Sequence, residues 1–236
     1  MLDDNRLPQA VLARASVPSR RDYGENVDAI SPELVLVDPG LAWAIRCESS
    51  STLFRVAFVC TGNRFRSALA AAAFRSVAAH LPVEVDSYGT LEIGSARPLP
   101  EAVAMAAAFG LELSGHVAKS LGTTDLSQRS LVIGFEPQHI TAAVDMAAAR
   151  AECAFLLREL NDLLEQVDVA PNHDPIERAI QTIARANLHR QRDPRRWLGR
   201  EIGDPMGLEQ SEQRAIGQAV CGGAIKAAKE LFGRVR

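Results

Sequence analysis

The sequence predicts an α/β fold in which helices cover both faces of a parallel sheet. From residue 54 onward, short apolar runs with β-strand character alternate with helical segments, an order typical of right-handed βαβ units. The chain has 236 residues, of which 47% are hydrophobic and 23% charged. That length and composition suffice to bury one substantial core, so we expect one α/β domain with additions.

Four short runs are predicted to be strands, three because they are mostly apolar and one because its valines alternate with acidic residues. They are FRVAFV (54–59), VEVDS (83–87), SLVIGF (130–135) and CAFLL (153–157). The stretches between and after them are predicted to be helices. These are RSALAAAAFRSVAA (66–79), LPEAVAMAAAFG (99–110), EPQHITAAVDMAAA (136–149) and LEQSEQRAIGQAVCGGAIKAAKELF (208–232). Proline near the start and glycine at the end favour the second of them, whereas Gly222-Gly223 weakens the last.

Two segments lie outside this alternation. Residues 1–52 form an N-terminal extension, interpreted either as a helical arm, because Ser31-Pro32 has the pattern of a helix start, or as a partly ordered tail. Residues 53–236 form the main domain. Within it, a polar, arginine-rich and partly helical stretch at about 158–200 is longer than an ordinary loop.

Composition excludes several classes of function. The formal net charge of −3 gives no overall electrostatic argument for binding nucleic acid. The four cysteines, Cys47, Cys60, Cys153 and Cys221, lack the spacing of a zinc site or a redox dithiol. The cysteines therefore indicate neither kind of site. Scattered cysteines and the lack of an apolar run of about 18 residues lead us to expect a cytoplasmic protein with no membrane span.

The stretch VCTGNRFRS (59–67) lies where the first strand passes into the first helix. A strand–loop–helix turn directs several backbone N–H groups toward one point at the positive end of the helix dipole, which favours phosphate-like dianions and thiolates. Gly62 permits a tight path and Asn63 tolerates left-handed backbone. Arg66 can fork onto two phosphoryl oxygens, and Ser67 can donate to Cys60. This set suits displacement at phosphorus through a cysteinyl phosphate.

The alternative is a buried structural cysteine at a strand end, which is common for an isolated thiol. Here the cysteine is followed after five residues by arginine and serine, with a strand before and a helix after. That combination favours the nucleophile. The chain contains no GxxxxGK[ST] loop that would indicate nucleotide binding instead.

These motifs resemble the low-molecular-weight protein tyrosine phosphatases. VCTGNRFRS is similar to the family's V-C-x-G-N-x-C-R-S, and DSYGT (86–90) to its S-A-G-T. RPLPEAVAMAAAFGLELSGHVAKSL (97–121) resembles the family's proline-flanked helix and the motif after it, and DLSQRSLVIGFEPQHI (125–140) its D-L-V-L-x-M-E-x-x-H stretch. EIGDPMG (201–207) resembles the late D-x-x-D-P-[FY]-G element.

The resemblance implies a four-stranded parallel sheet flanked by helices and a phosphatase that acts on phosphotyrosine in proteins without a metal or a cofactor. By that analogy Cys60 is the nucleophile, and Asn63 and Ser67 shape the loop and the thiolate. The aspartate of an Asp-Pro pair is then the general acid that protonates the leaving oxygen. The phosphoryl group is bound by Arg66 and by the backbone N–H groups of Thr61, Gly62, Asn63, Arg64, Phe65 and Arg66.

Four Asp-Pro pairs compete for the general-acid role. Asp38 precedes the catalytic strand, Asp174 has the pattern of a helix cap, and Asp193 lies in the arginine-rich stretch. Asp204 is followed by glycine and the terminal helix, as in the family, and is the predicted acid.

Several positions depart from the family pattern. Phe65 replaces a cysteine that relatives can pair with the nucleophile, Met206 replaces an aromatic residue that lines the substrate mouth, and Tyr88 replaces a small residue. The segment at 158–200 is a candidate lid. Its basic run is interpreted either as a site for an acidic or phosphorylated partner or as a solvated helix face; it comprises Arg190, Arg192, Arg195, Arg196 and Trp197.

Two competing functions remain open. Arsenate reductases share this scaffold, but their thiol relay needs two further cysteines on a mobile segment, and residues 88–129 contain none. A catalytically weak phosphoprotein-binding module would need neither a nucleophile nor an acid, so the joint presence of Cys60, Arg66 and Asp204 disfavours it.

Overall fold

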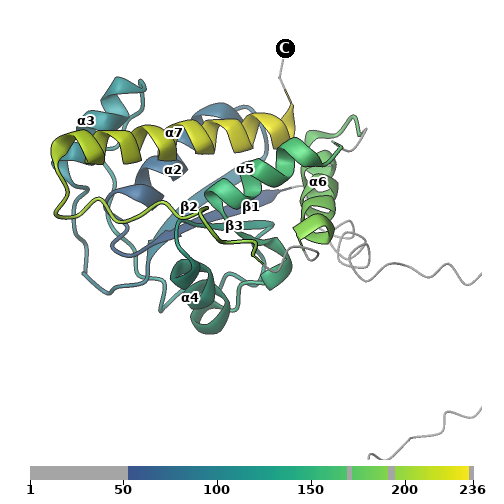
Figure 1. Cartoon of the computed structure of the whole chain (residues 1–236), viewed down its shortest axis with the longest axis horizontal. Coiled ribbons are helices and arrows are strands. Elements are labelled where there is room, and N and C mark those ends of the chain that lie inside the picture. The colour runs from purple at the N-terminus through teal and green to yellow at the C-terminus, as the bar shows by residue number, and fades with distance from the viewer. Residues whose placement is uncertain (1–52, 169–171, 191–194, 234–236) are drawn as a thin grey trace, which may run out of the picture. The chain divides into compact units, whose positions relative to one another are not determined.

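The computed structural model describes residues 53–168, 172–190 and 195–233 (Figure 1). The predicted N-terminal extension, with its helix start at Ser31, lies outside these residues. Asp38, Asp193 and Arg192 lie outside them as well.

The sheet has the four parallel strands that the sequence predicts. They are β1 (Phe54–Cys60), β2 (Val83–Gly89), β3 (Leu131–Gly134) and β4 (Ala154–Leu156), in the order β2-β1-β3-β4. All three pairings are parallel, and β1 pairs with both β2 and β3. The carboxyl ends of the strands therefore lie at one edge of the sheet, and Cys60, the last residue of β1, lies near the middle of that edge.

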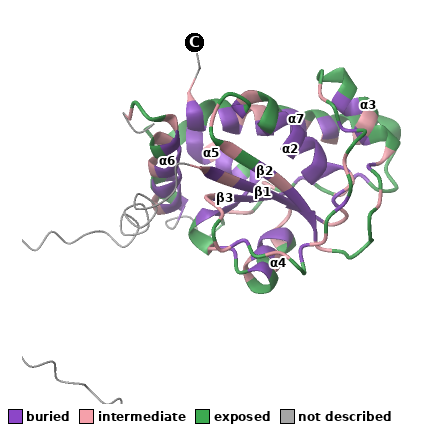
Figure 2. Cartoon of the chain, turned by 180° about the vertical axis from the view of Figure 1, so that it is seen from behind, coloured by how far each residue is buried: buried purple, intermediate pink, exposed green. Residues whose placement is uncertain are grey.

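Helices cover both faces, as predicted (Figure 1). One face is covered by α2 (Arg66–Ala78) and α7 (Gln210–Phe232), the other by α4 (Pro137–Ala147). Alternate residues of β1 explain the two layers, because Val56 and Phe58 join the core beneath α2 and α7, whereas Ala57 and Val59 join the core beneath α4. Figure 2 shows β1 and β3 buried between these layers.

Three more helices complete the described chain. The helix α3 (Pro100–Ala108) begins at proline, and Gly110 follows its end at φ 68°, the left-handed backbone that the sequence favours there. Between β4 and the Asp204 loop lie α5 (Leu157–Gln166) and α6 (Pro175–Arg190). Asp174 accepts hydrogen bonds from the backbone N–H groups of Ile176 and Glu177, so its predicted role as a helix cap is confirmed. None of the described helices is both long and apolar enough to cross a membrane.

The glycine pair in α7 does not interrupt that helix, which is continuous from Gln210 to Phe232. A Cβ on Gly223 would lie 3.1 Å from Leu157 Cδ2 and 3.2 Å from Asn161 Nδ2. Asn161 Nδ2 also donates to the Gly223 carbonyl oxygen at 3.2 Å. Glycine at this position therefore lets α5 approach α7 closely.

Both interpretations of Arg190 as a surface cation are wrong. Its side chain is buried, and its guanidinium lies 4.0 Å from the centroid of the Phe155 ring. It donates to the carbonyl oxygens of Ala151 and Ala154 and to Asn187 Oδ1. Arg190 thus joins α6 to the start of β4 from inside the fold, and burial lowers its pKa to about 10.

Candidate active site

The loop from Thr61 to Phe65 joins β1 to α2, as the sequence predicts, and α2 begins at Arg66. Asn63 adopts the expected left-handed backbone, with φ 50°. Its side-chain Nδ2 donates to Ser67 Oγ at 2.8 Å, and its Oδ1 accepts from the Lys119 backbone N–H at 2.8 Å. His116 Nε2 donates to the Asn63 carbonyl oxygen at 2.7 Å. These bonds tie the loop to the helix that follows and to the segment before β3.

The glycine that this loop requires is Gly89 rather than Gly62. A Cβ on Gly62 would meet only Ile93 Cδ1, at an ordinary 3.7 Å. A Cβ on Gly89, at the end of β2, would lie 2.9 Å from the Thr61 carbonyl oxygen and 3.0 Å from Asn63 N. Because Gly89 pairs with Cys60 in the sheet, its missing side chain lets the loop fold back over the strand end.

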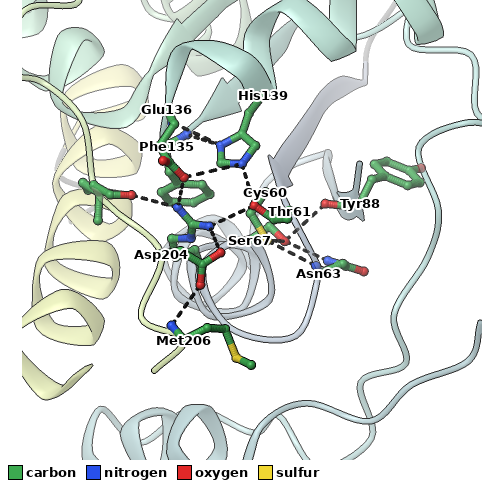
Figure 3. A network of polar contacts seen from close by, with 12 residues as sticks. Cys60, Thr61, Asn63, Ser67, Tyr88, Phe135, Glu136, His139, Asp204 and Met206 are labelled. Carbon is green, nitrogen blue, oxygen red and sulfur yellow. Dashed lines mark hydrogen bonds and ion pairs between the residues drawn. The ribbon is translucent and has the colours of Figure 1, made fainter. Parts of the chain in front are cut away.

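Cys60 is almost fully buried and has two polar neighbours (Figure 3). The Asn63 backbone N–H donates to Sγ at 3.2 Å, and Ser67 Oγ lies 3.0 Å from Sγ. Ser67 Oγ also lies 3.3 Å from the Tyr88 carbonyl oxygen. Since a hydroxyl has one proton, Ser67 can donate either to Tyr88 O or to the sulfur. A Cys60 thiol donates to Ser67 Oγ, whereas a thiolate accepts hydrogen bonds from both the Ser67 hydroxyl and the Asn63 N–H.

Arg66 has its two terminal nitrogens fully engaged. Nη1 donates to the Glu136 carboxylate and to the Ile202 carbonyl oxygen, the latter at 2.9 Å. Nη2 donates to Thr61 Oγ1 at 3.1 Å and to Asp204 Oδ2 at 2.6 Å. Arg66 is only 1% exposed as a residue, and its guanidinium is held between two carboxylates from distant parts of the chain.

Asp204, the general acid expected from the sequence, pairs with Arg66 beside the loop after β1. Its Oδ1 accepts from the Met206 backbone N–H at 3.0 Å, and its side chain is 38% exposed. Asp174, the other aspartate of an Asp-Pro pair among the described residues, caps the N-terminus of α6.

A cavity of about 190 Å³ opens above Cys60. Its walls are largely apolar and include the aliphatic side chains of Leu91, Ile93, Leu99 and Met206, while Arg64 brings a positive charge to it. The lining residues are Cys60, Thr61, Gly62, Arg64, Phe65, Arg66, Leu91, Ile93, Leu99, Asp204, Pro205 and Met206. All of these lie at 60–66, in the 91–99 segment or at 204–206, so nothing described in 158–200 lines this cavity. The expected lid is therefore not seen over Cys60.

The sequence interpretation missed two functional groups that follow β3 directly, Glu136 and His139. His139 Nδ1 accepts from the backbone N–H groups of Glu136, at 3.1 Å, and of Phe135, at 3.4 Å. The neutral ring therefore carries its proton on Nε2, which lies 3.1 Å from Thr61 Oγ1 (Figure 3). Burial and, secondarily, the charge of Arg66 lower the pKa of His139 to about 4, against an opposing effect of Asp204.

The Thr61 hydroxyl consequently accepts two hydrogen bonds, one from His139 and one from Arg66. Both acceptor positions of its oxygen are then used, so its own proton points elsewhere. Thr61 lines the cavity above Cys60. The hydroxyl proton is therefore left available to donate to an anion bound there.

Glu136 and His139 were detectable in principle, because polar residues just after a strand of a parallel sheet converge at its carboxyl edge. His116 had no comparable signal, since it lies in a loop. In the part of the chain that the structure describes, no three His, Cys, Asp or Glu side chains gather in a way that could hold a metal ion.

The family model of the low molecular weight phosphotyrosine protein phosphatases matches residues 55–192. The chain belongs to this family. The family match ends before Asp204, so that residue rests on the geometry described above.

A curated relative is the low molecular weight protein-tyrosine-phosphatase of Streptomyces coelicolor, which is 36% identical over 109 residues. That alignment covers 43% of this chain and 64% of the relative, so the chain spans less than two thirds of the curated phosphatase that it matches.

Solved structures support the family fold. The YwlE mutant from Bacillus subtilis has a TM-score of 0.53 and 22% identity, covering 75% of this chain and 98% of its own. The low molecular weight protein tyrosine phosphatase from T. tengcongensis has a TM-score of 0.52 and 23% identity, covering 73% and 96%. At these identities the similarity establishes the shared fold.

Proposed function

We propose that this family member hydrolyses phosphomonoesters of the phosphotyrosine type through a cysteinyl-phosphate intermediate. Cys60 is the nucleophile, Arg66 and the loop amides bind the phosphoryl group, and Asp204 is the general acid and base. The observation that carries the proposal is that Cys60, Arg66 and Asp204 line one cavity, although Arg66 and Asp204 are 138 positions apart in the chain.

In the first step the Cys60 thiolate attacks phosphorus. The S–P bond forms as the bond from phosphorus to the ester oxygen breaks, and protonated Asp204 gives its proton to the departing oxygen. In the second step the Asp204 carboxylate takes a proton from water, whose oxygen attacks phosphorus. The S–P bond breaks, inorganic phosphate leaves, and the Cys60 thiolate and protonated Asp204 are restored.

Arg66 must exchange partners for this chemistry to begin. Its Nη2 donates to Asp204, and a phosphoryl group that is bound by two guanidinium N–H groups needs a donor from that side. Phosphate binding therefore frees Asp204 from Arg66 and leaves it beside the leaving group. Nη1 keeps its partners, Glu136 and the Ile202 carbonyl oxygen, so the guanidinium plane stays in place.

The cavity walls favour an aryl phosphate. The curated relative is named a tyrosine phosphatase, whereas YwlE from Geobacillus stearothermophilus, a structural neighbour, is named an arginine phosphatase. The aliphatic walls can pack against a neutral aromatic ring, while Arg64 in the lining repels a guanidinium group. We therefore assign a phosphotyrosine-containing protein as the substrate rather than phosphoarginine or nucleic acid.

The surroundings of Cys60 disfavour a thiol relay of the arsenate-reductase type. Cys153 precedes β4 and so lies at the amino edge of the sheet, opposite Cys60, and its Sγ donates to the carbonyl oxygens of Arg129 and Arg150. Cys221 is buried in α7, and burial raises its pKa to about 12. Neither thiol lines the cavity above Cys60.

The wider organisation is part of the same proposal. Residues 1–52 are an extension to a phosphatase domain at 53–236, and the stretch at about 158–200 is an insertion in that domain. Scattered cysteines suit a reducing compartment, so we place the protein in the cytoplasm.

Turnover of p-nitrophenyl phosphate tests the proposal. We expect the wild type to release p-nitrophenol and Cys60→Ser to lose that activity while keeping its thermal unfolding transition. A phosphotyrosine peptide should be hydrolysed in preference to a phosphoarginine peptide. A folded wild type that binds phosphate without turnover would instead support the phosphoprotein-binding module.

A further inference from the structure

The chain reaches Asp204 through an irregular segment that lies along α5. We call residues 197–204 the acid segment. Trp197 Nε1 donates to Glu159 Oε2 at 3.2 Å, and Arg200 Nε pairs with Asp162 Oδ2 at 2.8 Å. Arg158 Nη1 donates to the Glu201 carbonyl oxygen at 3.0 Å. Three side chains of a single helix thus hold three successive parts of the acid segment.

The helix α5 is a firm support for these contacts. Its leucines are buried, and Gly223 lets it pack closely on α7. Glu159 is fully buried and also accepts from the Leu156 backbone N–H at 3.0 Å, which ties the start of α5 to the end of β4. Because α5 is fixed to the sheet and to α7, its contacts hold the acid segment in a defined position.

The other end of the acid segment is fixed at the candidate active site. The Ile202 backbone N–H donates to the Phe135 carbonyl oxygen at 2.8 Å, just beyond β3. The Ile202 carbonyl oxygen accepts from Arg66 Nη1 at 2.9 Å. Only Gly203 separates Ile202, which makes both of these hydrogen bonds, from Asp204. A shift of the acid segment along α5 would therefore move the Asp204 carboxylate.

We propose that α5 is a brace for the general acid, and that Asp162 and Arg200 are positioning residues that set where Asp204 stands over the leaving group. The inference rests on the function proposed above. On this proposal the stretch at 158–200 positions Asp204 and does not act as the lid expected from the sequence.

The loss of rate expected when the Asp162–Arg200 ion pair is removed depends more on the displacement of Asp204 than on the strength of the pair. Asp162 and Arg200 are partly exposed, at 46% and 23% of their side-chain surfaces, and such pairs contribute little to stability. A misplacement of about 1 Å at a reacting group can cost about 100-fold in rate. Partial loosening of the acid segment should therefore lower the acid-dependent rate by about 3- to 10-fold and leave the fold intact.

The chain offers a matched control on the same helix. Glu165 of α5 pairs with Lys226 of α7 and is likewise exposed, but it does not touch the acid segment. Asp162→Asn and Glu165→Gln each remove one charge and one surface ion pair from α5. Only the first substitution loosens the hold on Arg200.

The test measures kcat/KM for aryl phosphates of graded leaving-group pKa, together with the inhibition constant of inorganic phosphate. Asp162→Asn should lower kcat/KM about 3- to 10-fold for phenyl phosphate and far less for p-nitrophenyl phosphate, whose leaving group needs little protonation. The phosphate inhibition constant should not change. Glu165→Gln should match the wild type, and the charge swap Asp162→Arg with Arg200→Asp should recover part of the loss.

A uniform loss across all leaving groups, or the same loss in Glu165→Gln, would overturn the brace and leave α5 with a general structural role. Asp204→Asn separates this failure from a failure of the proposed function. If Asp204→Asn shows the leaving-group dependence and Asp162→Asn does not, the brace is wrong and the general acid stands. If Asp204→Asn shows none, both are wrong.

Discussion

The buried neutral His139 makes the stability of this protein depend on pH in a defined window. The side chain has no exposed surface, and its pKa falls from 6.5 to about 4, mainly through burial and secondarily through Arg66. Its Nδ1 faces two backbone N–H donors, so a second ring proton would have no acceptor there. The folded state therefore excludes a proton that the unfolded chain takes up below about pH 6.5.

The sign and the size of this change in the free energy of unfolding follow from the linkage between proton binding and folding. Because the folded pKa of His139 lies below its unfolded value, its contribution is fully present above about pH 6.5 and is lost as the pH falls toward about 4. The shift of about 2.5 units corresponds to about 3 kcal/mol over the whole window. About 2 kcal/mol of the free energy of unfolding should be lost by about pH 5.

Urea unfolding of the wild type and of His139→Gln, measured from about pH 7.5 to about pH 5, checks this value. Glutamine does not titrate, so the wild type should lose about 2 kcal/mol more than the variant across that range. The comparison uses the slopes with pH, since the substitution also lowers stability at every pH. Parallel curves for the two proteins would refute the assignment of a buried neutral imidazole.

Two further predictions concern the loop above Cys60. Thr61→Val, which removes the oriented hydroxyl at nearly constant volume, should raise the inhibition constant of inorganic phosphate about tenfold, whereas Thr61→Ser should keep it near the wild-type value; equal effects would show that the hydroxyl makes no contact with the anion. Gly89→Ala should lower the free energy of unfolding by about 1–3 kcal/mol and reduce turnover, because the added Cβ meets loop backbone. Gly62→Ala is the stability control, since its Cβ has ordinary space, and equal destabilisation by the two would contradict the packing argument.

Most of the fold could be predicted from local patterns. The strand that ends at Cys60 and the helix that begins at Arg66 are both marked by runs of apolar or small residues, and alternation alone gives the parallel sheet. The left-handed Asn63 and the cap at Asp174 could also be predicted, because each depends on a residue type and its immediate neighbours.

The features that could not be predicted from the sequence depend on contacts between distant segments. Arg190 belongs to a basic run that looks solvated, yet tertiary packing buries it over Phe155. The need for glycine at 89 arises only because the loop after β1 folds back on that residue. The orientation of Thr61 requires His139, 78 positions away. No local pattern encodes such pairs, although the convergence of strand ends in a parallel sheet points to where they meet.

In the proposed mechanism the phosphoryl group is transferred first to Cys60 and then to a water molecule that Asp204 activates. The most direct test of this mechanism is to quench the protein during turnover of p-nitrophenyl phosphate and to locate the phosphoryl group by peptide mass spectrometry. We predict phosphate on the peptide that carries Cys60, more of it in Asp204→Asn because that variant activates water poorly, and none in Cys60→Ala. Turnover without a phosphorylated Cys60 peptide in either the wild type or Asp204→Asn would contradict the mechanism.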